Sequence, residues 1–172
     1  MKTITTHTTV YKFEELSDEG KAKVLEHYYD INVDFDWWDC TYDDAKTIGC
    51  KITEFDIDRG SYCRLTCDDA HWTACLIVEN HGETCDTHKL AKQYLKDREK
   101  IFSQAAKDND GEIPEYPTKD FLDDLDAAFV RALGEEYLSL LRQEYDYQTS
   151  EEAIKETIEA NDYDFTEEGR IF

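Results

Sequence analysis

Cysteine and histidine side chains in the first half of the sequence could bind a metal ion. Two short runs supply them, Cys63, Cys67 and His71 and then His81, Cys85 and His88. Zinc prefers such sulfur and nitrogen ligands in a tetrahedral arrangement. However, neither run has the usual Cys-x2-Cys spacing, and a free cysteine also packs as a small hydrophobic residue. We therefore predict no cofactor, and a zinc site at these six residues is the alternative.

Catalytic chemistry has little support in the sequence. The five histidines and six cysteines stand in no recognised local setting for a nucleophile and its base. The run Asp-Asn-Asp-Gly at 108–111 is close to a calcium loop, but Ala106 and Pro117 would occupy positions that need acidic ligands. The sequence has no P-loop and no Gly-x-Gly-x-x-Gly motif. We therefore predict that the protein is not an enzyme.

The stretch from Tyr28 to Asp44 combines dense negative charge with large aromatic side chains. Residues 24–45 include seven acidic residues and no Lys or Arg. We expect this stretch to bind a partner, with the acidic residues giving charge and two aromatic residues acting as anchors. The predicted binding residues are Asp30, Asp34, Asp36, Trp37, Asp39, Tyr42, Asp43 and Asp44. The alternative is a structural role, since Trp38, Ala45 and Ile48 share one helical face.

The C-terminal end is a second negative region. Residues 143–172 include ten acidic residues and two basic ones. Its predicted binding residues are Glu151, Glu152, Asp162, Asp164, Glu167 and Glu168. Basic residues gather in one place, as a stripe formed by Lys89, Lys92, Lys96 and Lys100. We expect this stripe to face water or neighbouring acidic residues, and contact with RNA or DNA is the alternative.

The whole chain is strongly acidic. Its 172 residues include 41 Asp and Glu but only 19 Lys and Arg, which gives a formal net charge of −22 at pH 7. Nucleic acid and anionic membrane repel such a protein, and a basic surface attracts it. Improved solubility is the simpler explanation of the charge. Because we find no apolar segment typical of a signal peptide or membrane span, we expect a cytoplasmic protein with reduced cysteines and no membrane contact.

The pattern of apolar residues predicts an α+β fold in a single domain over residues 1–172. Strands are expected at 5–13, 50–58 and 61–67, and a turn at Arg59-Gly60 joins the last two into a hairpin. These three strands would form a small antiparallel sheet that packs against a mostly helical body. The tail at 161–172 is predicted to form a short hairpin or to stay mobile.

Periodicity and capping residues predict the helices. We expect them over residues 17–29, 36–48, 68–81, 84–107, 120–145 and 149–160, with the main loop at 108–118. The fifth is the longest, because its apolar residues keep the helical period over about seven turns. It should form the centre of the core.

Four segments carry a resemblance to known proteins. They read YKFEELSDEGKAKVLEHYYD, DFDWWDCTYDDAKTIGCKITEFDIDRG, ENHGETCDTHKLAKQYL and SEEAIKETIEANDYDFTEEG. With these segments the chain resembles a group of mostly uncharacterised phage and prophage proteins, some of them labelled antitoxin-like. It is also similar to anti-CRISPR inhibitors of the type II RNA-guided nuclease. The resemblance implies a phage or mobile-element origin and a protein target in the host cytoplasm, and it assigns no site residue.

Charge and resemblance together predict an acidic inhibitor of a bacterial defence protein. We expect it to bind the basic nucleic-acid-binding surface of that protein, with a CRISPR effector nuclease as the favoured target, since such nucleases hold nucleic acid in positively charged channels. It would act as a DNA mimic, by occlusion without catalysis. The alternatives are an antitoxin-type neutraliser of a basic toxin, a zinc-binding accessory protein, and a phage structural protein without an acidic interface.

Overall fold

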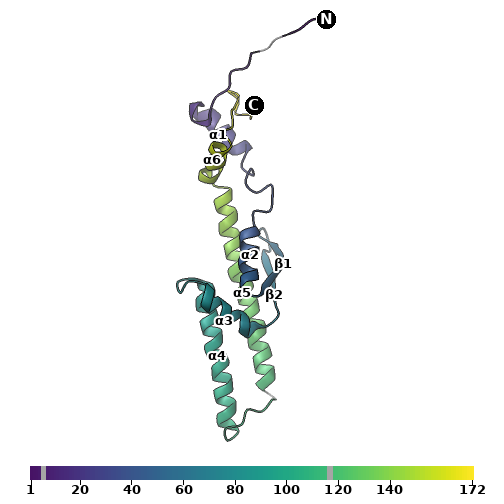
Figure 1. Ribbon diagram of the computed structural model, residues 1–172, viewed down its shortest axis with the longest axis vertical. Coiled ribbons are helices and arrows are strands. Elements are labelled where there is room, and N and C mark those ends of the chain that lie inside the picture. Colours follow the sequence, from purple (N-terminus) through teal and green to yellow (C-terminus); the bar gives the residue numbers. More distant parts are fainter. Residues whose placement is uncertain (5–6, 116–117) are drawn as a thin grey trace. The chain divides into compact units, whose positions relative to one another are not determined.

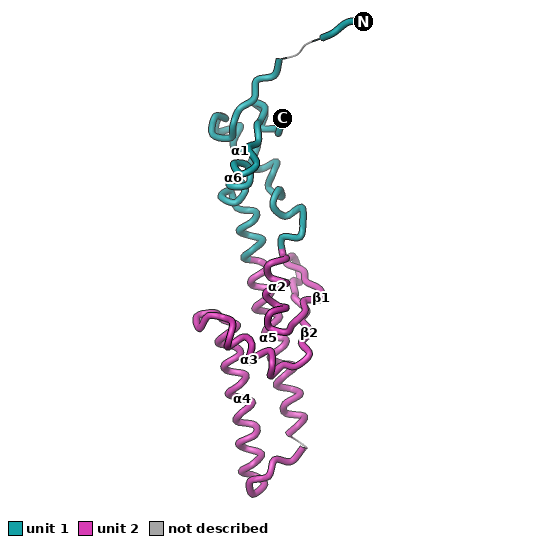
Figure 2. Tube along the Cα trace, in the orientation of Figure 1, with its two compact units in different colours: residues 1–37, 143–172 teal, residues 38–142 magenta. Residues whose placement is uncertain are grey.

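The computed structural model describes residues 1–4, 7–115 and 118–172 of the chain. Within them the chain forms six α-helices and one two-stranded antiparallel sheet, which confirms the α+β class (Figure 1). The chain divides into two compact units, which we call unit 1 (residues 1–37 and 143–172) and unit 2 (residues 38–142) (Figure 2). None of the helices in the described ranges combines the length and apolar character needed to cross a membrane.

Unit 1 is built from both ends of the chain. It contains the 3-10 helix η1 (Phe13–Glu15), α1 (Asp18–His27), α6 (Glu151–Ala160) and the last residues of α5 (Thr118–Gln148). The hydroxyl of Ser17 accepts a hydrogen bond from the Gly20 amide at 3.2 Å and so caps α1, as predicted. The core of unit 1 consists of Phe13, Leu16, Val24, Ile154, Ile158 and Phe165. At the C-terminal tail, Phe165 pairs through isolated bridges with Tyr11 and Ile171.

The strand predicted at 5–13 is wrong. Residues 7–10 have no regular structure, Tyr11 forms only its bridge to Phe165, and Phe13 begins η1. Thr5 and Thr6 lie outside the described residues. The β-branched threonines suit a strand, but they offer no large apolar face to bury against a sheet. The sheet therefore has two strands in the described chain, where about three were expected.

Unit 2 contains the predicted hairpin. Strands β1 (Cys50–Asp56) and β2 (Tyr62–Cys67) pair antiparallel, with a bulge between Ile52 and Glu54. Gly60 has a φ of 80°, which is the conformation that the predicted turn requires. A disulfide joins Cys50 to Cys67 across the first pair of the ladder. The prediction that all cysteines are reduced is therefore wrong for this pair.

Four helices complete unit 2. They are α2 (Asp39–Thr47), α3 (Ala70–Asn80), α4 (Asp86–Asp108) and α5 up to Arg142. Their core residues, with those of the hairpin, are Ala45, Ile48, Cys50, Ile52, Leu65, Ala70, Ala74, Ile77, Ala91, Tyr94, Phe129, Leu133 and Tyr137. The ring of Trp38 lies 5.5 Å from that of Phe55, so this tryptophan packs inside unit 2. Gly134 lets α5 approach β2, since a Cβ at this residue would lie 2.7 Å from the carbonyl oxygen of Cys63.

Several predicted helix N-caps are displaced by one or two residues. The N-cap of α2 is Trp38 and not Asp36, because the Trp37 amide donates to the Phe35 carbonyl at 2.7 Å in a tight turn before the helix. The N-cap of α4 is Cys85 and not Thr84. Before α6, the cap is Ser150, while the predicted cap Thr149 donates its hydroxyl to the Tyr145 carbonyl. Tyr116 and Pro117, in the loop predicted at 108–118, lie outside the described residues.

Candidate partner-binding site

A groove in unit 1 brings acidic side chains to the edge of an apolar surface. It lies along α1 and α6 and has a volume of about 690 Å³. Phe13, Leu25 and Ile154 form its floor, and they belong to the core of unit 1 or pack against it. Tyr29 also lines the groove and is 47% exposed. A large aromatic ring is thus available to a partner beside hydrophobic surface.

Four carboxylates surround this groove, from Glu14, Asp18, Glu26 and Glu151. Two of them have internal cations: Lys21 lies 3.5 Å from Glu14, and Lys155 lies 3.2 Å from Glu151. Asp18 and Glu26 have no lysine or arginine partner among the described residues. Because such exposed ion pairs are weak, a cation from a partner can compete for all four carboxylates.

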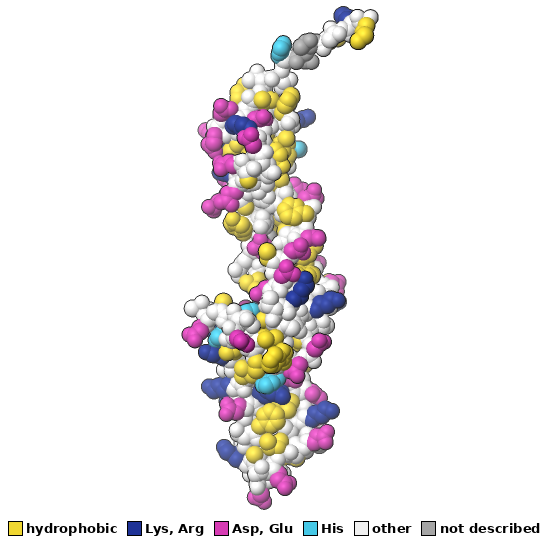
Figure 3. Space-filling view, in the orientation of Figure 1, with side chains coloured by type: hydrophobic (Ala, Val, Ile, Leu, Met, Phe, Trp, Pro, Cys, Tyr) yellow, Lys and Arg dark blue, Asp and Glu magenta, His cyan; other side chains and the backbone are white. Residues whose placement is uncertain are grey.

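A row of carboxylates follows the exposed side of α6. Ala153, Ile154 and Ile158 are buried on the opposite side. The exposed residues of the row are Glu152, Glu156 and Glu159. On the face shown in Figure 3, Asp and Glu side chains gather over the part of the chain that contains α1 and α6. The packing of α6 therefore holds several negative charges at fixed spacing.

The predicted acidic stretch at 28–44 is divided between the two units. Asp30, Asp34 and Asp36 are exposed in unit 1. Asn32 anchors this segment, because its side chain donates to the Gln148 carbonyl at 3.0 Å and accepts from the Thr157 hydroxyl at 2.6 Å. In the same unit the half-buried Trp37 packs against the ring of Tyr145 at 5.5 Å.

The other four members of the stretch lie in unit 2. Asp44 accepts a 2.6 Å hydrogen bond from the Tyr137 hydroxyl, and its other oxygen lies 3.6 Å from Nε2 of His81. Burial and this hydrogen bond raise the pKa of Tyr137. Asp43 pairs with Lys46 at 2.7 Å, and Asp39 is exposed. The half-buried Tyr42 packs on Phe55, with 6.2 Å between ring centres. Asp44 and Tyr42 thus contribute to the structure of unit 2.

The C-terminal acidic residues differ in whether a lysine of the same chain already pairs with them. Asp162 and Asp164 each lie 2.8 Å from Nζ of Lys12. Glu151 pairs with Lys155, as described above. Glu152, Glu167 and Glu168 are exposed and form no ion pair within the described residues. Sequence reasoning missed Lys12, which is 150 residues away from Asp162.

The predicted lysine stripe lies on α4. Lys89 pairs with Asp86 and Lys100 with Asp97, each at 2.7 Å. Lys92 and Lys96 are exposed. Half of the stripe is thus compensated by acidic residues of its own helix, and contact with nucleic acid through it stays a prediction.

The proposed zinc ligands do not come together. Cys67 is in the disulfide, and Cys85 is exposed. Nδ1 of His81 lies 2.8 Å from the Thr87 hydroxyl, and Nδ1 of His88 lies 2.9 Å from the His81 carbonyl oxygen. His71 lies beside Cys75, and Cys63 is half-buried in β2, where burial raises the pKa of its thiol to about 11. Among the described residues, no three His, Cys, Asp or Glu side chains are placed to hold a metal ion.

Sequence reasoning missed most of the groove in unit 1. Of its acidic residues only Glu151 was predicted. The spacing of Asp18, Leu25 and Tyr29 would place them on one face of a helix, but no local pattern indicates that this face meets α6.

Comparison with known proteins gives no relative. No protein-family model matches the sequence, and neither curated proteins nor solved structures give a match. The resemblance to phage and anti-CRISPR proteins therefore stays a prediction, and the site rests on the geometry of the groove and on its charge.

Proposed function

We propose that the protein is a non-catalytic binding protein that uses the acidic surface of unit 1 to occupy a basic, nucleic-acid-binding surface of a bacterial defence protein. A CRISPR effector nuclease is the favoured target. The observation that carries this proposal is the concentration of fixed carboxylates in unit 1. Its 67 residues include 18 Asp and Glu but only six Lys and Arg, a net charge of −12.

The spacing of the row on α6 supports DNA mimicry. An α-helix rises about 1.5 Å per residue, so Glu152, Glu156 and Glu159 are spaced by about 6 and 4.5 Å along the axis. One strand of DNA carries a negative charge about every 3.4 Å. The row is less dense than phosphate but of the same order, so arginines and lysines arranged for a nucleic-acid backbone can meet it.

The groove beside α1 adds an anchor to this charge. Long basic side chains have apolar stems, which can pack on Leu25 while their charged ends reach Asp18 and Glu26. The ring of Tyr29 offers a face for a cation. Charge alone mainly raises the association rate, whereas a buried anchor slows dissociation.

An inhibition assay with matched charge variants tests the proposal. The triple variant Glu152→Gln, Glu156→Gln, Glu159→Gln removes the row on α6. The control Glu79→Gln, Glu83→Gln, Glu99→Gln removes the same charge from exposed positions of unit 2. With a purified type II effector and its guide RNA, we expect the first variant to inhibit DNA cleavage about tenfold less well and the control to stay within about twofold.

Two outcomes would contradict the proposal. If the unaltered protein neither binds nor inhibits the effector, the target is wrong, and binding to a basic toxin in the same assay would favour an antitoxin. If both triple variants lose the same activity, the effect comes from net charge and not from unit 1. The variant Tyr29→Ala distinguishes the contribution of the aromatic anchor from that of charge. It should speed dissociation and leave the salt dependence of association unchanged.

A further inference from the structure

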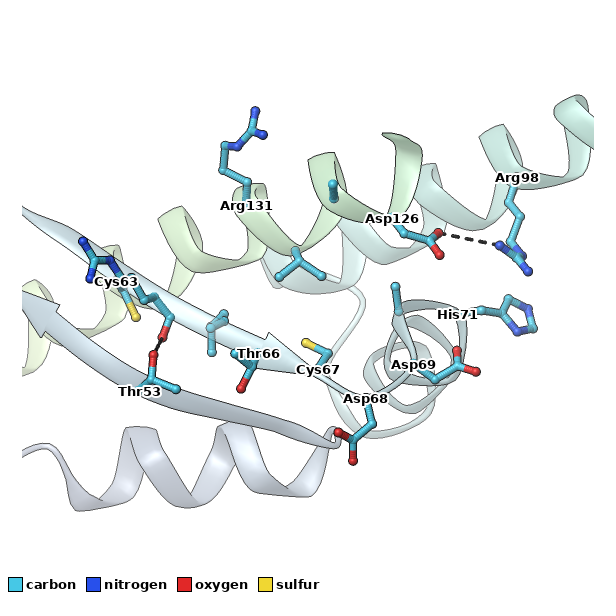
Figure 4. A pocket seen from close by; sticks show the side chains of 15 residues that line it. Thr53, Cys63, Thr66, Cys67, Asp68, Asp69, His71, Arg98, Asp126 and Arg131 are labelled. Atoms are coloured by element: carbon cyan, nitrogen blue, oxygen red, sulfur yellow. Dashed lines mark hydrogen bonds and ion pairs between the residues drawn. The ribbon is translucent and has the colours of Figure 1, made fainter. Parts of the chain in front are cut away.

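A groove in unit 2 opens along the outer edge of strand β2. It has a volume of about 860 Å³ and is lined by residues 63–67 of β2, the start of α3 and one side of α5, together with Thr53 of β1 and Arg98 of α4 (Figure 4). Figure 4 shows β2 between β1 and α5, with Asp126 and Arg131 on the α5 side. The groove lies entirely within residues 38–142, and it is separate from the acidic groove of unit 1.

The register of the hairpin shows which backbone groups face this groove. The Cα atoms of Cys50 and Cys67 are 4.5 Å apart, which is typical of a non-hydrogen-bonded pair in an antiparallel ladder. Because such pairs alternate with hydrogen-bonded ones, Leu65 opposite Ile52 is also non-hydrogen-bonded. The N–H and C=O groups of Leu65 and Cys67 therefore point away from β1.

These groups lack a backbone partner. Among the described residues, the sheet ends at β2, and no backbone hydrogen bond joins Leu65 or Cys67 to a residue outside the hairpin. At Cys63 the situation differs, since Gly134 brings α5 against its carbonyl oxygen. Helix α5 thus closes the edge at Cys63 and leaves it open from Leu65 to Cys67. An open strand edge is a template for a further strand.

The side chains that line this groove are balanced in charge, although the whole chain is strongly acidic, because three aspartates, Asp68, Asp69 and Asp126, lie among as many arginines. Three of the six arginines of the sequence line the groove, Arg64, Arg98 and Arg131. Arg64 pairs with Glu54 at 2.6 Å, and Arg98 lies 3.6 Å from Asp126. Arg131 is exposed and has no carboxylate within ion-pair distance among the described residues. Apolar contact is available beside it from Val130.

We propose that β2 binds an extended peptide from another protein as a third strand, with an acidic side chain or a C-terminal carboxylate of that peptide placed on Arg131. The main chain of the peptide pairs with Leu65 and Cys67, which supplies affinity, and its side chains contact Arg131 and Val130, which supplies selectivity. Arginine suits this role because its guanidinium can bind both oxygens of a carboxylate. The proposal concerns a second surface and does not depend on the function of unit 1.

The test uses the full chain and a phage-displayed library of random heptapeptides. We expect selection to enrich peptides that share an acidic residue, and synthetic versions to bind with affinities that fluorescence anisotropy can measure. N-methylation of alternate peptide amides should weaken binding at least tenfold, because it removes the main-chain donors of a strand. The variant Arg131→Glu should cause a loss of similar size, whereas Arg59→Glu, the same charge change in the hairpin turn outside the groove, should not.

Three results would overturn the proposal. One is the absence of an enriched acidic position. A second is binding that persists whichever alternate set of peptide amides is N-methylated, since a peptide added as a strand must donate hydrogen bonds from one of these two sets. The third is self-association through this edge, detected by sedimentation as a dimer that Arg131→Glu disrupts, because a second copy would then be the occupant. Circular dichroism of each variant establishes that a loss of binding is not a loss of fold.

Discussion

Units 1 and 2 carry similar net charges on cores of different size. Unit 1 has a net charge of −12 in 67 residues, and unit 2 has −10 in 105. The main core cluster of unit 1 contains six buried residues, and that of unit 2 contains thirteen. Like charge opposes folding more where it is dense and the core is small. The charge of unit 1 therefore costs more stability per residue than the charge of unit 2 does.

The two units also use their carboxylates differently. In unit 2, Asp44 and Asp126 each accept a 2.6 Å hydrogen bond from a buried tyrosine, Tyr137 and Tyr94 respectively. In unit 1, the carboxylates of the groove and of the α6 row are exposed or half-exposed at the surface. Asp44 and Asp126 thus take part in the packing of unit 2, whereas the groove and row carboxylates of unit 1 face solvent.

The largest expected effect distinguishes the glycines of the two units. In unit 2, Gly134→Ala should reduce the free energy of unfolding by about 2 kcal/mol or more, because the new Cβ meets backbone at Cys63. In unit 1, Gly20→Ala should change it by about 1 kcal/mol or less, since its nearest atoms are the Leu16 Cβ at 3.3 Å and the Ser17 hydroxyl at 3.4 Å. Urea denaturation measures both. Equal free energies of unfolding for the two variants would show that α5 does not contact the β2 backbone closely at Gly134.

Alkaline pH should weaken unit 2 in particular. Burial raises the pKa of the Cys63 thiol to about 11, and burial together with hydrogen bonding to Asp126 raises the pKa of Tyr94. A group whose pKa is higher in the folded state than in the unfolded state stabilises the folded protein as long as the pH is below the unfolded pKa. This stabilisation is lost as the pH rises from the unfolded pKa through the folded pKa. Stability should therefore decline from about pH 9 to pH 11. Urea midpoints across this range measure the effect.

The variant Tyr137→Phe provides the control for the pH experiment. It removes one of the hydroxyl groups whose pKa is raised, so stability at pH 8 should fall while the dependence on alkaline pH becomes shallower. A pH dependence identical to that of the unaltered protein would mean that Tyr137 does not titrate with unfolding.

Salt should produce the smallest effect and should act mainly on unit 1. Raising the ionic strength from about 0.01 M to 1 M shortens the screening length from about 30 to 3 Å. We expect amide hydrogen exchange to slow at Val24 and Ile158 of unit 1, by the equivalent of about 1 kcal/mol or less, and to change less at Leu133 and Ile77 of unit 2. A larger change in unit 2 would contradict the comparison of charge densities.

Local patterns in the sequence were enough for most of the elements. The period from Phe121 to Tyr145 predicted the long helix, since a continuous apolar stripe admits few other structures. The glycine at 60 predicted the hairpin turn. The strand at 5–13 failed because propensity was its only support, and propensity without burial does not form a sheet.

The disulfide could not be predicted from the hairpin alone. If Asp56 pairs with Tyr62, regular counting along the two strands places Cys67 opposite Lys51. The bulge between Ile52 and Glu54 shifts the register by one residue, so Cys67 faces Cys50.

The acidic grouping of unit 1 could not be predicted for a related reason. The contact of α1 with α6 and the ion pairs of Lys12 join residues from opposite ends of the chain.

The two neighbouring tryptophans have an experimental use. Trp37 packs against Tyr145 in unit 1, and Trp38 packs against Phe55 in unit 2. One peptide bond therefore separates two fluorophores whose surroundings belong to different units. Variants that keep only Trp37 or only Trp38, with the exposed Trp72 also replaced, would report by emission wavelength and quenching on each unit in turn during titration or unfolding.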